Sequence, residues 1–410
     1  MNAELIETLA REHGSLYLYD QAAIERDALV LKRDFAGFGL LYSVKANPAD
    51  EVLATLLGLG FGADAASAAE VVAAVREGLP RELIQYSAPG KTRRDIEIAI
   101  EQATIVADSL AEIERIREVA EARGLKVGIG VRVNPEFSYG GTGGVPSKFG
   151  IDEDQLFKYL AEASADGAVR VTGLHVHVAS QVLDTEALEG CHRYLFDLVR
   201  RVRAAAGGKL EFLNLGSGIG IPYGAGDPEV DTARLGAAAQ ALLAEFRKEA
   251  PETKVYLETG RFVACRAGYY ITTVLDRKVS HGKTFLILAN TLNGFYKPSI
   301  TRMVKKYAAG ASPAGCEPLY TRTAEGDAFR ILTLKPLAAP TEKVTLVGNL
   351  CTAADVAAED VELPRLEPGD VVAFTNAGTY AAVLSPMQFA QLPRPAEIFL
   401  GKDGRAVRCG

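Results

Sequence analysis

Lys45 lies at the end of an apolar, β-prone run, LLYSVKANP at 40–48. Lysine is among the residues least often buried unless its charge is paired. Two explanations fit such a lysine. One is an ion pair of structural value only, which Lys45 taken alone slightly favours. The other is an amine whose pKa is lowered by burial or by cationic neighbours, so that it can form a Schiff base with an aldehyde.

Further polar residues occur where other β-prone runs end. They are Arg132, His175, His177, Ser180, the turn GSGIG at 216–220, Glu258 and Arg261. Taken singly, His177 fits a packed histidine, the turn fits a backbone with positive φ, and Glu258 fits a rim salt bridge. Taken together, a lysine, an acid and a turn whose N–H groups can approach a phosphate favour an aldehyde cofactor with a phosphate and a ring nitrogen. Pyridoxal phosphate (PLP) has these three features.

These residues must be positioned by the elements around them. Eight short β-prone runs alternate with helical patterns, and they begin at Leu40, Phe61, Leu83, Thr104, Lys126, Val171, Phe212 and Lys254. Ser67 and Ser109 are predicted helix N-caps, with Glu70 and Glu112 completing capping boxes. Strands that alternate with helices form parallel βαβ units. Eight of them imply an α/β fold, a closed (β/α)8 barrel over 28–265, with active residues at the C-terminal ends of the strands.

The pattern changes after Cys265. Short strands separated by Gly, Pro and Asp follow, with no long amphipathic helix between them, which predicts a mostly antiparallel β domain over 266–410. The strand-like run SLYLYD near the start joins 1–27 to that domain. The Gly-rich segment at 138–150 lacks the GK[ST] ending of a phosphate loop, so it is either a mobile barrel loop or a lid over the site.

Composition excludes several classes of function. The 410 residues carry a net charge of −7 with no strong basic run, which argues against a nucleic-acid partner. We expect no membrane span and no signal peptide, because no apolar stretch is long enough and the N-terminus lacks a basic start. The five cysteines form no CxxC pair. They fit reduced thiols and therefore a cytoplasmic protein, and they do not suggest a zinc site.

Six ordered motifs resemble those of a known family. The motifs YSVKANP, HVHVASQ, LGSGIGIPY, ETGRFV, GNLCTAAD and NAGTY occur in the order found in the PLP-dependent decarboxylases that include the diaminopimelate, ornithine and arginine enzymes. The likeness covers nearly the whole chain. It implies an alanine-racemase-like barrel with a C-terminal β domain, a carboxy-lyase activity on an amino-acid substrate, PLP as cofactor, and a homodimer with shared active sites.

The resemblance also implies roles for single residues. Lys45 resembles the Schiff-base lysine, His177 the residue that stacks on the cofactor ring, and Glu258 the acid on the pyridine nitrogen. Cys351 resembles the catalytic cysteine delivered across the dimer interface. Residues that match phosphate or other cofactor contacts are Asp64, Arg132, Ser180, Gly216, Ser217, Gly218, Gly260, Arg261 and Tyr380. A racemase with a similar barrel has an arginine in place of Glu258, so the glutamate favours decarboxylation.

Departures from the diaminopimelate branch concern the substrate. That branch has glutamate after the catalytic cysteine, where this chain has Thr352, and an RPxLY element where this chain has Lys297 and Thr301. Arg261, Asn293, Lys297 and Thr352 are the predicted substrate contacts. These features look more like decarboxylases of siderophore and other secondary-metabolite pathways, which act on conjugates such as citryl-diaminopropionate. The alternatives are a diaminopimelate decarboxylase, a PLP racemase, or a non-enzymatic PLP-binding protein.

Overall fold

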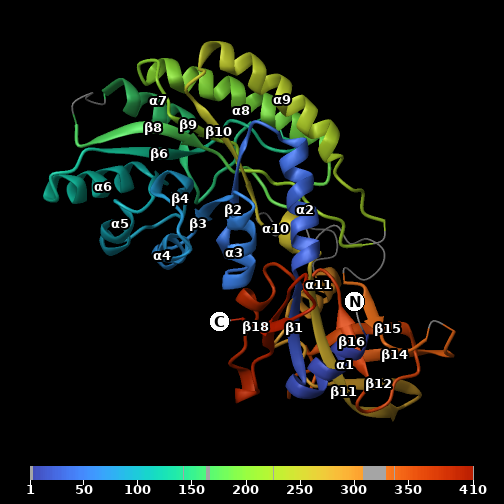
Figure 1. Ribbon diagram of the computed structural model, residues 1–410. Helices are drawn as coiled ribbons and strands as arrows, with labels where there is room; N and C mark the ends of the chain where they lie inside the picture. Colours follow the sequence, from blue (N-terminus) through green and yellow to red (C-terminus); the bar gives the residue numbers. More distant parts are fainter. Residues whose placement is uncertain are drawn as a thin grey trace.

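The chain forms two sheets, and each is the centre of one part of the molecule in Figure 1. The computed structural model describes residues 3–141, 143–162, 167–224, 226–307, 329–336 and 338–409. Part of the predicted β domain, including Cys316, therefore lies outside the described residues. Within the described ranges no helix is long and apolar enough to cross a membrane.

The first sheet is the predicted barrel. Eight parallel strands follow one another around a closed ring, because β5 pairs with β6 and β10 pairs with β2. They are β2 (Gly39–Ser43), β3 (Gly62–Ala65), β4 (Ile84–Tyr86), β5 (Thr104–Ala107), β6 (Val127–Asn134), β8 (Val169–His175), β9 (Phe212–Asn214) and β10 (Lys254–Thr259). A two-residue strand, β7 (Ile151–Asp152), adds to the edge of β6. All eight predicted barrel strands are confirmed.

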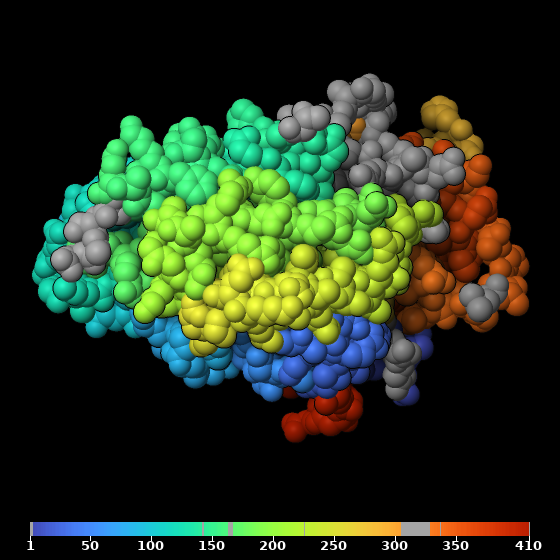
Figure 2. Space-filling model, turned by 90° about the horizontal axis from the view of Figure 1, so that it is seen from above, coloured from blue at the N-terminus to red at the C-terminus, as the bar shows by residue number. Residues whose placement is uncertain are grey.

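Helices cover the outside of the ring. They are α2 (Gln21–Asp34), α3 (Asp50–Gly58), α4 (Ala68–Arg76), α5 (Arg93–Ala99), α6 (Leu110–Ala122), α7 (Glu153–Glu162), α8 (Thr185–Ala205), α9 (Thr232–Glu249) and the short α10 (Arg261–Ala264). Two 3-10 turns, η1 (Val44–Ala46) and η2 (Arg81–Leu83), lie next to β2 and β4. Figure 2 shows α8 and α9 lying side by side across one face. The proposed domain boundary at residue 28 falls inside α2.

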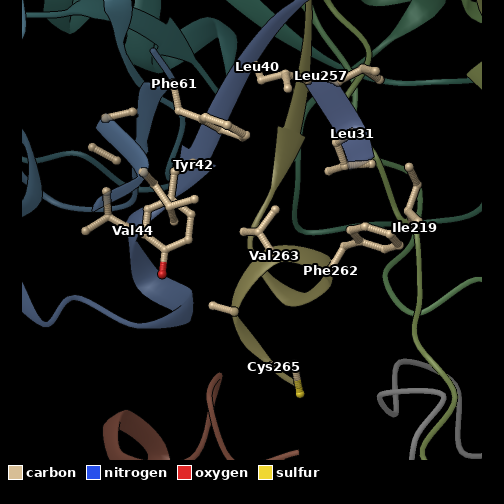
Figure 3. Close-up of a cluster of buried hydrophobic side chains, with 14 of the residues drawn as sticks. Leu31, Leu40, Tyr42, Val44, Phe61, Ile219, Leu257, Phe262, Val263 and Cys265 are labelled. Carbon is tan, nitrogen blue, oxygen red and sulfur yellow. The ribbon is translucent and has the colours of Figure 1, made fainter. Parts of the chain in front are cut away.

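Two apolar cores stabilise the barrel. The outer core packs the helices on the strands, and Figure 3 shows Leu31 of α2 and Val263 of α10 within it. Inside the ring, the Phe212 side chain occupies space that neighbouring glycines leave open. A Cβ added to Gly173 would lie 2.1 Å from the Phe212 ring, and one added to Gly130 would lie 2.7 Å from it. The barrel is therefore a filled core below the level of the polar strand ends.

The second sheet is the predicted β domain. Its strands are β1 (Ser15–Asp20), β11 (Gly268–Ser280), β12 (Lys283–Leu288), β13 (Ile331–Thr333), β14 (Thr341–Val347), β15 (Val356–Pro364), β16 (Val371–Phe374), β17 (Ala396–Leu400) and β18 (Ala406–Arg408). Among them β1 with β17 and β12 with β14 pair in parallel, and the other described pairs are antiparallel. The run at 15–20 joins this sheet as predicted.

Helices and turns complete the β domain. They are α1 (Ala3–His13), α11 (Lys297–Tyr307), η3 (Ala382–Leu384) and η4 (Phe389–Gln391). The sequence predicted no long amphipathic helix in this domain, and the structure has a helix of 11 residues there, α11, which follows β12. Its sequence, KPSITRMVKKY, begins with a lysine and a proline at the first turn, where proline is tolerated because its missing N–H has no intrahelical partner.

Candidate active site

Most of the predicted residues meet in one cavity of about 400 Å³ at the C-terminal ends of the barrel strands. Its wall includes Lys45, Arg132, His177, Ser180, Ser217, Gly218, Glu258, Gly260, Arg261 and Tyr380. Asp64 lies buried beneath Lys45, and Gly216 lies directly beside His177. Residues that sequence reasoning did not single out also line it, among them Ser87, Ala88, Phe149 and Leu384.

Lys45 lies in η1, directly after β2, with its side chain 42% exposed. Its Nζ is 2.7 Å from Asp64 Oδ2. Ser43 Oγ donates to the same carboxylate at 2.9 Å, and Ser87 donates to its other oxygen. Burial acts to lower the pKa of the Lys45 amine, but the charges of Asp64 and Glu258 outweigh burial and raise it above its ordinary value. The ion pair is therefore real, and the lowered pKa is not found in this structure.

Glu258 lies in β10 and lines the same cavity as Lys45. Its Oε1 accepts hydrogen bonds from His175 Nε2 and from Asn214 Nδ2, both at 2.9 Å. Burial would raise the pKa of this carboxyl group, but His175, Lys45 and His177 outweigh burial and lower the pKa well below its usual range. Glu258 is therefore a buried, ionised acceptor that faces the cavity.

His177 is a neutral ring in the cavity wall. Burial lowers its pKa to about 4, against the opposing charge of Glu258. Its partner two residues earlier, His175, bonds Glu258 and keeps its other ring nitrogen, Nδ1, buried without a hydrogen-bond partner. The bond to the Glu258 carboxylate requires a proton on His175 Nε2, because a carboxylate oxygen can only accept. The two histidines thus differ in role, as the strand pattern allowed.

Another part of the cavity wall is made of small residues and backbone. Gly216 and Gly218 have φ of 62° and 82°, and a Cβ at either would lie 2.4 Å or 2.5 Å from a carbonyl oxygen. Gly260 approaches Ala46 equally closely, since its added Cβ would lie 2.7 Å from the alanine methyl group. Ser180 and Ser217 line the same part of the cavity. The glycines permit this tight turn, and the two serine hydroxyl groups are donors that suit a phosphate.

Arg132 forms one side wall. Its guanidinium lies 3.7 Å from Asp108 Oδ1 and 4.3 Å above the ring of Phe149, the next-to-last residue of the Gly-rich segment. Gly150 N donates to Asp108 Oδ2 at 3.2 Å. The C-terminal end of the segment is therefore part of the cavity wall, and its function as a lid stays a prediction.

A buried ion pair supports the adjacent wall. Lys91 Nζ donates to Glu112 Oε1 at 2.7 Å and to the carbonyl oxygens of Ala88 and Val106 at 2.6 and 2.7 Å. Burial lowers the pKa of the Lys91 amine, against the charge of Glu112. Ala88 lines the cavity. The pair is therefore a structural support that sequence reasoning missed.

The β domain closes the cavity. Tyr380 has φ of 51°, its N–H donates to Ala46 O at 2.9 Å, and its ring lies 5.0 Å from the Arg261 guanidinium carbon. Asn47 Nδ2 donates to Gly378 O at 2.9 Å. These bonds join the residues next to Lys45 to the segment that carries Tyr380, as the predicted contribution of Tyr380 requires.

The remaining predicted residues do not line the cavity of the single chain. Cys351 and Thr352 lie between β14 and β15, and Cys351 is exposed. Asn293 and Lys297 are buried in the β domain, with Lys297 Nζ 5.5 Å from the Tyr380 ring. Their roles toward a substrate stay predictions.

The donor set fits PLP: an amine for the aldehyde, an ionised acid for the ring nitrogen, and a backbone cradle for the phosphate. The family model for the pyridoxal-binding domain of the pyridoxal-dependent decarboxylases matches residues 21–265. The chain belongs to this family. The protein is thus a PLP-dependent decarboxylase, a carboxy-lyase.

Similar proteins extend over nearly the full length of this decarboxylase. It is 32% identical to the L-glutamyl-[BtrI acyl-carrier protein] decarboxylase of Niallia circulans, covering 97% of this chain and 91% of that one. It is 31% identical to the diaminopimelate decarboxylase of Methanothermobacter thermautotrophicus, covering 98% and 90%.

Solved structures of the family agree with the fold. The diaminopimelate decarboxylase of Helicobacter pylori, complexed with L-lysine, superposes with a TM-score of 0.81 at 26% identity, covering 98% of this chain and 95% of that one. The diaminopimelate decarboxylase of M. jannaschii superposes with a TM-score of 0.85 at 25% identity, covering 98% and 90%. A barrel with a β domain is therefore the fold of this decarboxylase.

Proposed function

We propose that this decarboxylase removes the α-carboxylate of an amino acid whose distal end is conjugated or carrier-bound, in the cytoplasm and within a siderophore or other secondary-metabolite pathway. The observation that carries the proposal is Thr352, where the diaminopimelate branch has a glutamate suited to a distal ammonium. Among the described residues that line the cavity, Glu258 is the one carboxylate. Because Glu258 is assigned to the ring nitrogen of the cofactor, no lining carboxylate is left for a distal ammonium of the substrate. A relative that acts on a glutamyl group on an acyl-carrier protein supports the proposal.

Residues of the cavity would hold the cofactor. Lys45 would hold its aldehyde carbon, Glu258 its ring nitrogen and His177 one face of its ring. The turn at 216–218, with Ser180, Gly260, Arg261 and Tyr380, would hold its phosphate, while Asp64 and Arg132 would orient Lys45 and the cofactor edge. PLP supplies an electron sink for the pair of electrons left on the α-carbon when CO2 departs.

The protein's own part in the reaction is to keep Glu258 ionised and to return a proton. Glu258 stays charged because the Lys45 ammonium lies near it and because His175 and Asn214 donate hydrogen bonds to its Oε1. The α-carbon must gain one proton after CO2 leaves, and the Cys351 thiol of the partner subunit donates it. We infer a homodimer from this, since Cys351 is exposed and outside the cavity of its own chain.

Mixing two inactive variants tests the shared site. Lys45→Ala and Cys351→Ala each inactivate a homodimer, and a random mixture of the two regains about a quarter of the wild-type activity, because half of the dimers are hybrids with one intact site. Mass determination by light scattering gives the oligomeric state independently. A mixture with no activity, or a monomer that is fully active, contradicts the shared site.

A substrate panel tests the reaction. CO2 release is measured with glutamyl-carrier protein, citryl-diaminopropionate, meso-diaminopimelate, ornithine and arginine. Robust lysine formation from meso-diaminopimelate would favour the lysine pathway instead. Loss of optical activity without CO2 would indicate a racemase, and no reaction at all a PLP-binding protein.

Thr352 offers a gain-of-function test. Thr352→Glu restores the carboxylate that suits a distal ammonium, so activity toward meso-diaminopimelate rises about tenfold or more. Thr352→Gln has the same shape without the charge and serves as the control. Equal activity of the two variants toward meso-diaminopimelate contradicts the assignment of Thr352 to the distal end of the substrate.

A further inference from the structure

Asn214, the last residue of β9, contacts both Glu258 and the turn at Gly216 through one side chain. The residue is 0% exposed. Its Nδ2 donates to Glu258 Oε1 at 2.9 Å and to Gln85 Oε1 at 2.7 Å, and its Oδ1 accepts from Gly216 N at 2.9 Å. Both N–H groups and the carbonyl oxygen are therefore used.

We propose that Asn214 is a positioning residue that fixes the acid of the ring nitrogen relative to the turn that holds the phosphate. The inference rests on the proposed roles of Glu258 and Gly216. The distance between the Glu258 carboxylate and the turn at Gly216 must match the distance between the ring nitrogen and the phosphate of one rigid cofactor. Asn214 joins the two protein groups that set that distance.

The backbone at this point supports the same coupling. Glu258 N donates to Gly216 O at 2.8 Å, and Val176 N donates to Asn214 O at 3.0 Å. These bonds hold the strand ends of β8, β9 and β10 in register, but they leave the Glu258 carboxylate free to rotate. The Asn214 amide is what ties that carboxylate to the Gly216 amide. An ionised aspartate there cannot donate to Glu258, and a leucine can neither donate nor accept.

The two bonds to Glu258 also select one of its oxygens. His175 Nε2 and Asn214 Nδ2 both bind Oε1. In the described part of the chain this leaves Oε2 as the oxygen for a ring nitrogen in the cavity. The other charged or titratable groups that face Glu258 are Lys45, His177 and Arg132. The Asn214 amide does not titrate, so it orients the carboxylate without adding charge at any pH.

The test uses two substitutions and a matched control in the full-length holoenzyme. Asn214→Asp keeps the acceptor for Gly216 N but replaces the donor to Glu258 with a second carboxylate. Asn214→Leu removes both interactions. Asn290→Asp is the control, because Asn290 is also buried and hydrogen-bonded, to Tyr270, but lies in the β domain away from the cavity.

The readouts are the absorbance spectrum of the bound cofactor as a function of pH, and the dissociation constants of PLP and of pyridoxal. We expect Asn214→Asp to weaken PLP and pyridoxal alike, by about 10- to 100-fold, because a hydrogen bond to a charged group is lost. Two adjacent carboxylates share a proton. The bound-cofactor spectrum of this variant therefore gains a pH-dependent transition near neutral pH that the wild type lacks.

Asn214→Leu distinguishes the phosphate end. It should lose PLP affinity about fivefold further than pyridoxal affinity, because only PLP uses the turn at Gly216. Wild-type spectra and affinities in Asn214→Asp, or equal changes in Asn290→Asp, would overturn the proposal. If Asn214→Leu does not fold, the isosteric aspartate variant still decides. None of these readouts requires turnover, so a wild type that releases no CO2 would refute the proposed function and leave the role of Asn214 standing.

Discussion

Replacing Lys91 with methionine is a direct test of how the cavity wall is supported. Methionine keeps the unbranched shape of lysine and removes the ammonium. The Lys91 side chain is 0% exposed and that of Glu112 is 1% exposed, so the substitution leaves the Glu112 carboxylate buried without its cation. The carbonyl oxygens of Ala88 and Val106 lose their donor at the same time.

The structure sets the size of the effect. Breaking a buried ion pair from one side costs about 3–5 kcal/mol. Glu112 keeps two backbone donors, Lys91 N and Asp108 N at 3.2 Å, which favours the lower end of that range. The two carbonyls add about 1 kcal/mol each. We therefore expect Lys91→Met to lower the free energy of unfolding by about 5 kcal/mol.

The assay is urea unfolding followed by far-UV circular dichroism, since the chain contains no tryptophan. A second variant, Lys91→Met with Glu112→Gln, removes the orphan charge and keeps one acceptor oxygen, which serves one of the two backbone N–H groups. It should recover about 2 kcal/mol relative to Lys91→Met, because one backbone hydrogen bond is lost. If the double variant is no more stable than the single one, the reasoning from an unpaired buried charge is wrong.

Three further predictions concern the cofactor amine, the barrel interior and pH. Lys45→Ala should purify without the yellow colour of bound PLP, and a wild type whose colour survives borohydride unchanged would contradict the assignment of this amine. Gly173→Ala should destabilise the barrel by about 1–3 kcal/mol in urea unfolding, because its Cβ would lie 2.1 Å from the Phe212 ring. Phe212→Leu in the same chain should recover part of the loss. Burial lowers the pKa of His177 and of His192 to about 4, so the unfolded chain binds protons that the folded chain does not as pH falls from about 6.5 to 4. Stability should fall across that range and stay level with respect to these groups above it. His192→Leu should make the fall smaller, and an unchanged pH dependence in that variant would count against this origin.

The sequence predicted elements well where the signal was local. Ser67 and Ser109 cap their helices as expected, each accepting from the N–H three residues on. The capping boxes predicted with them are wrong, because the second half of each box is absent. Glu112 turns instead to Lys91 and Asp108 N, and Glu70 accepts from Ala66 N. Lys91 and Glu112 are 21 residues apart, so their pairing depends on the packing of neighbouring βα units and leaves no local pattern.

The residues of the candidate site that follow the strand ends could be predicted from the sequence. The buried residues inside the barrel that hold them in place could not. Lys45, His177 and Glu258 stand in motifs, and the parallel barrel brings them to one edge. Asn214 and Gln85 interact across 129 residues and do so inside the ring. The one signal available was the position of Asn214 at the end of a strand, two residues before the turn glycine Gly216.

The β domain was harder to predict in detail. Lys297 was matched to a substrate-binding arginine by its place in a motif, yet the structure buries it at the start of α11. Cys351 and Thr352 lie outside the cavity of their own chain, and the proposed shared site assigns them to the cavity of a second subunit. Motif alignment identifies residues that correspond between relatives, whereas burial and assembly decide which side chains reach a ligand.

The hydrogen bonds of Ala46 and Asn47 limit how this enzyme can be shortened or rearranged. Asn47 is bonded to a carbonyl 331 residues later in the chain, and Ala46 to the N–H of Tyr380. A gene truncated after Cys265 would encode all eight barrel strands, yet the loop that carries Lys45 would have lost its outer support. A minimal one-domain version would therefore need a grafted segment in place of 378–380. In a circular permutant, new termini placed within 45–47 or 378–380 would break these hydrogen bonds. New termini placed in a loop next to one of the outer helices would leave them intact.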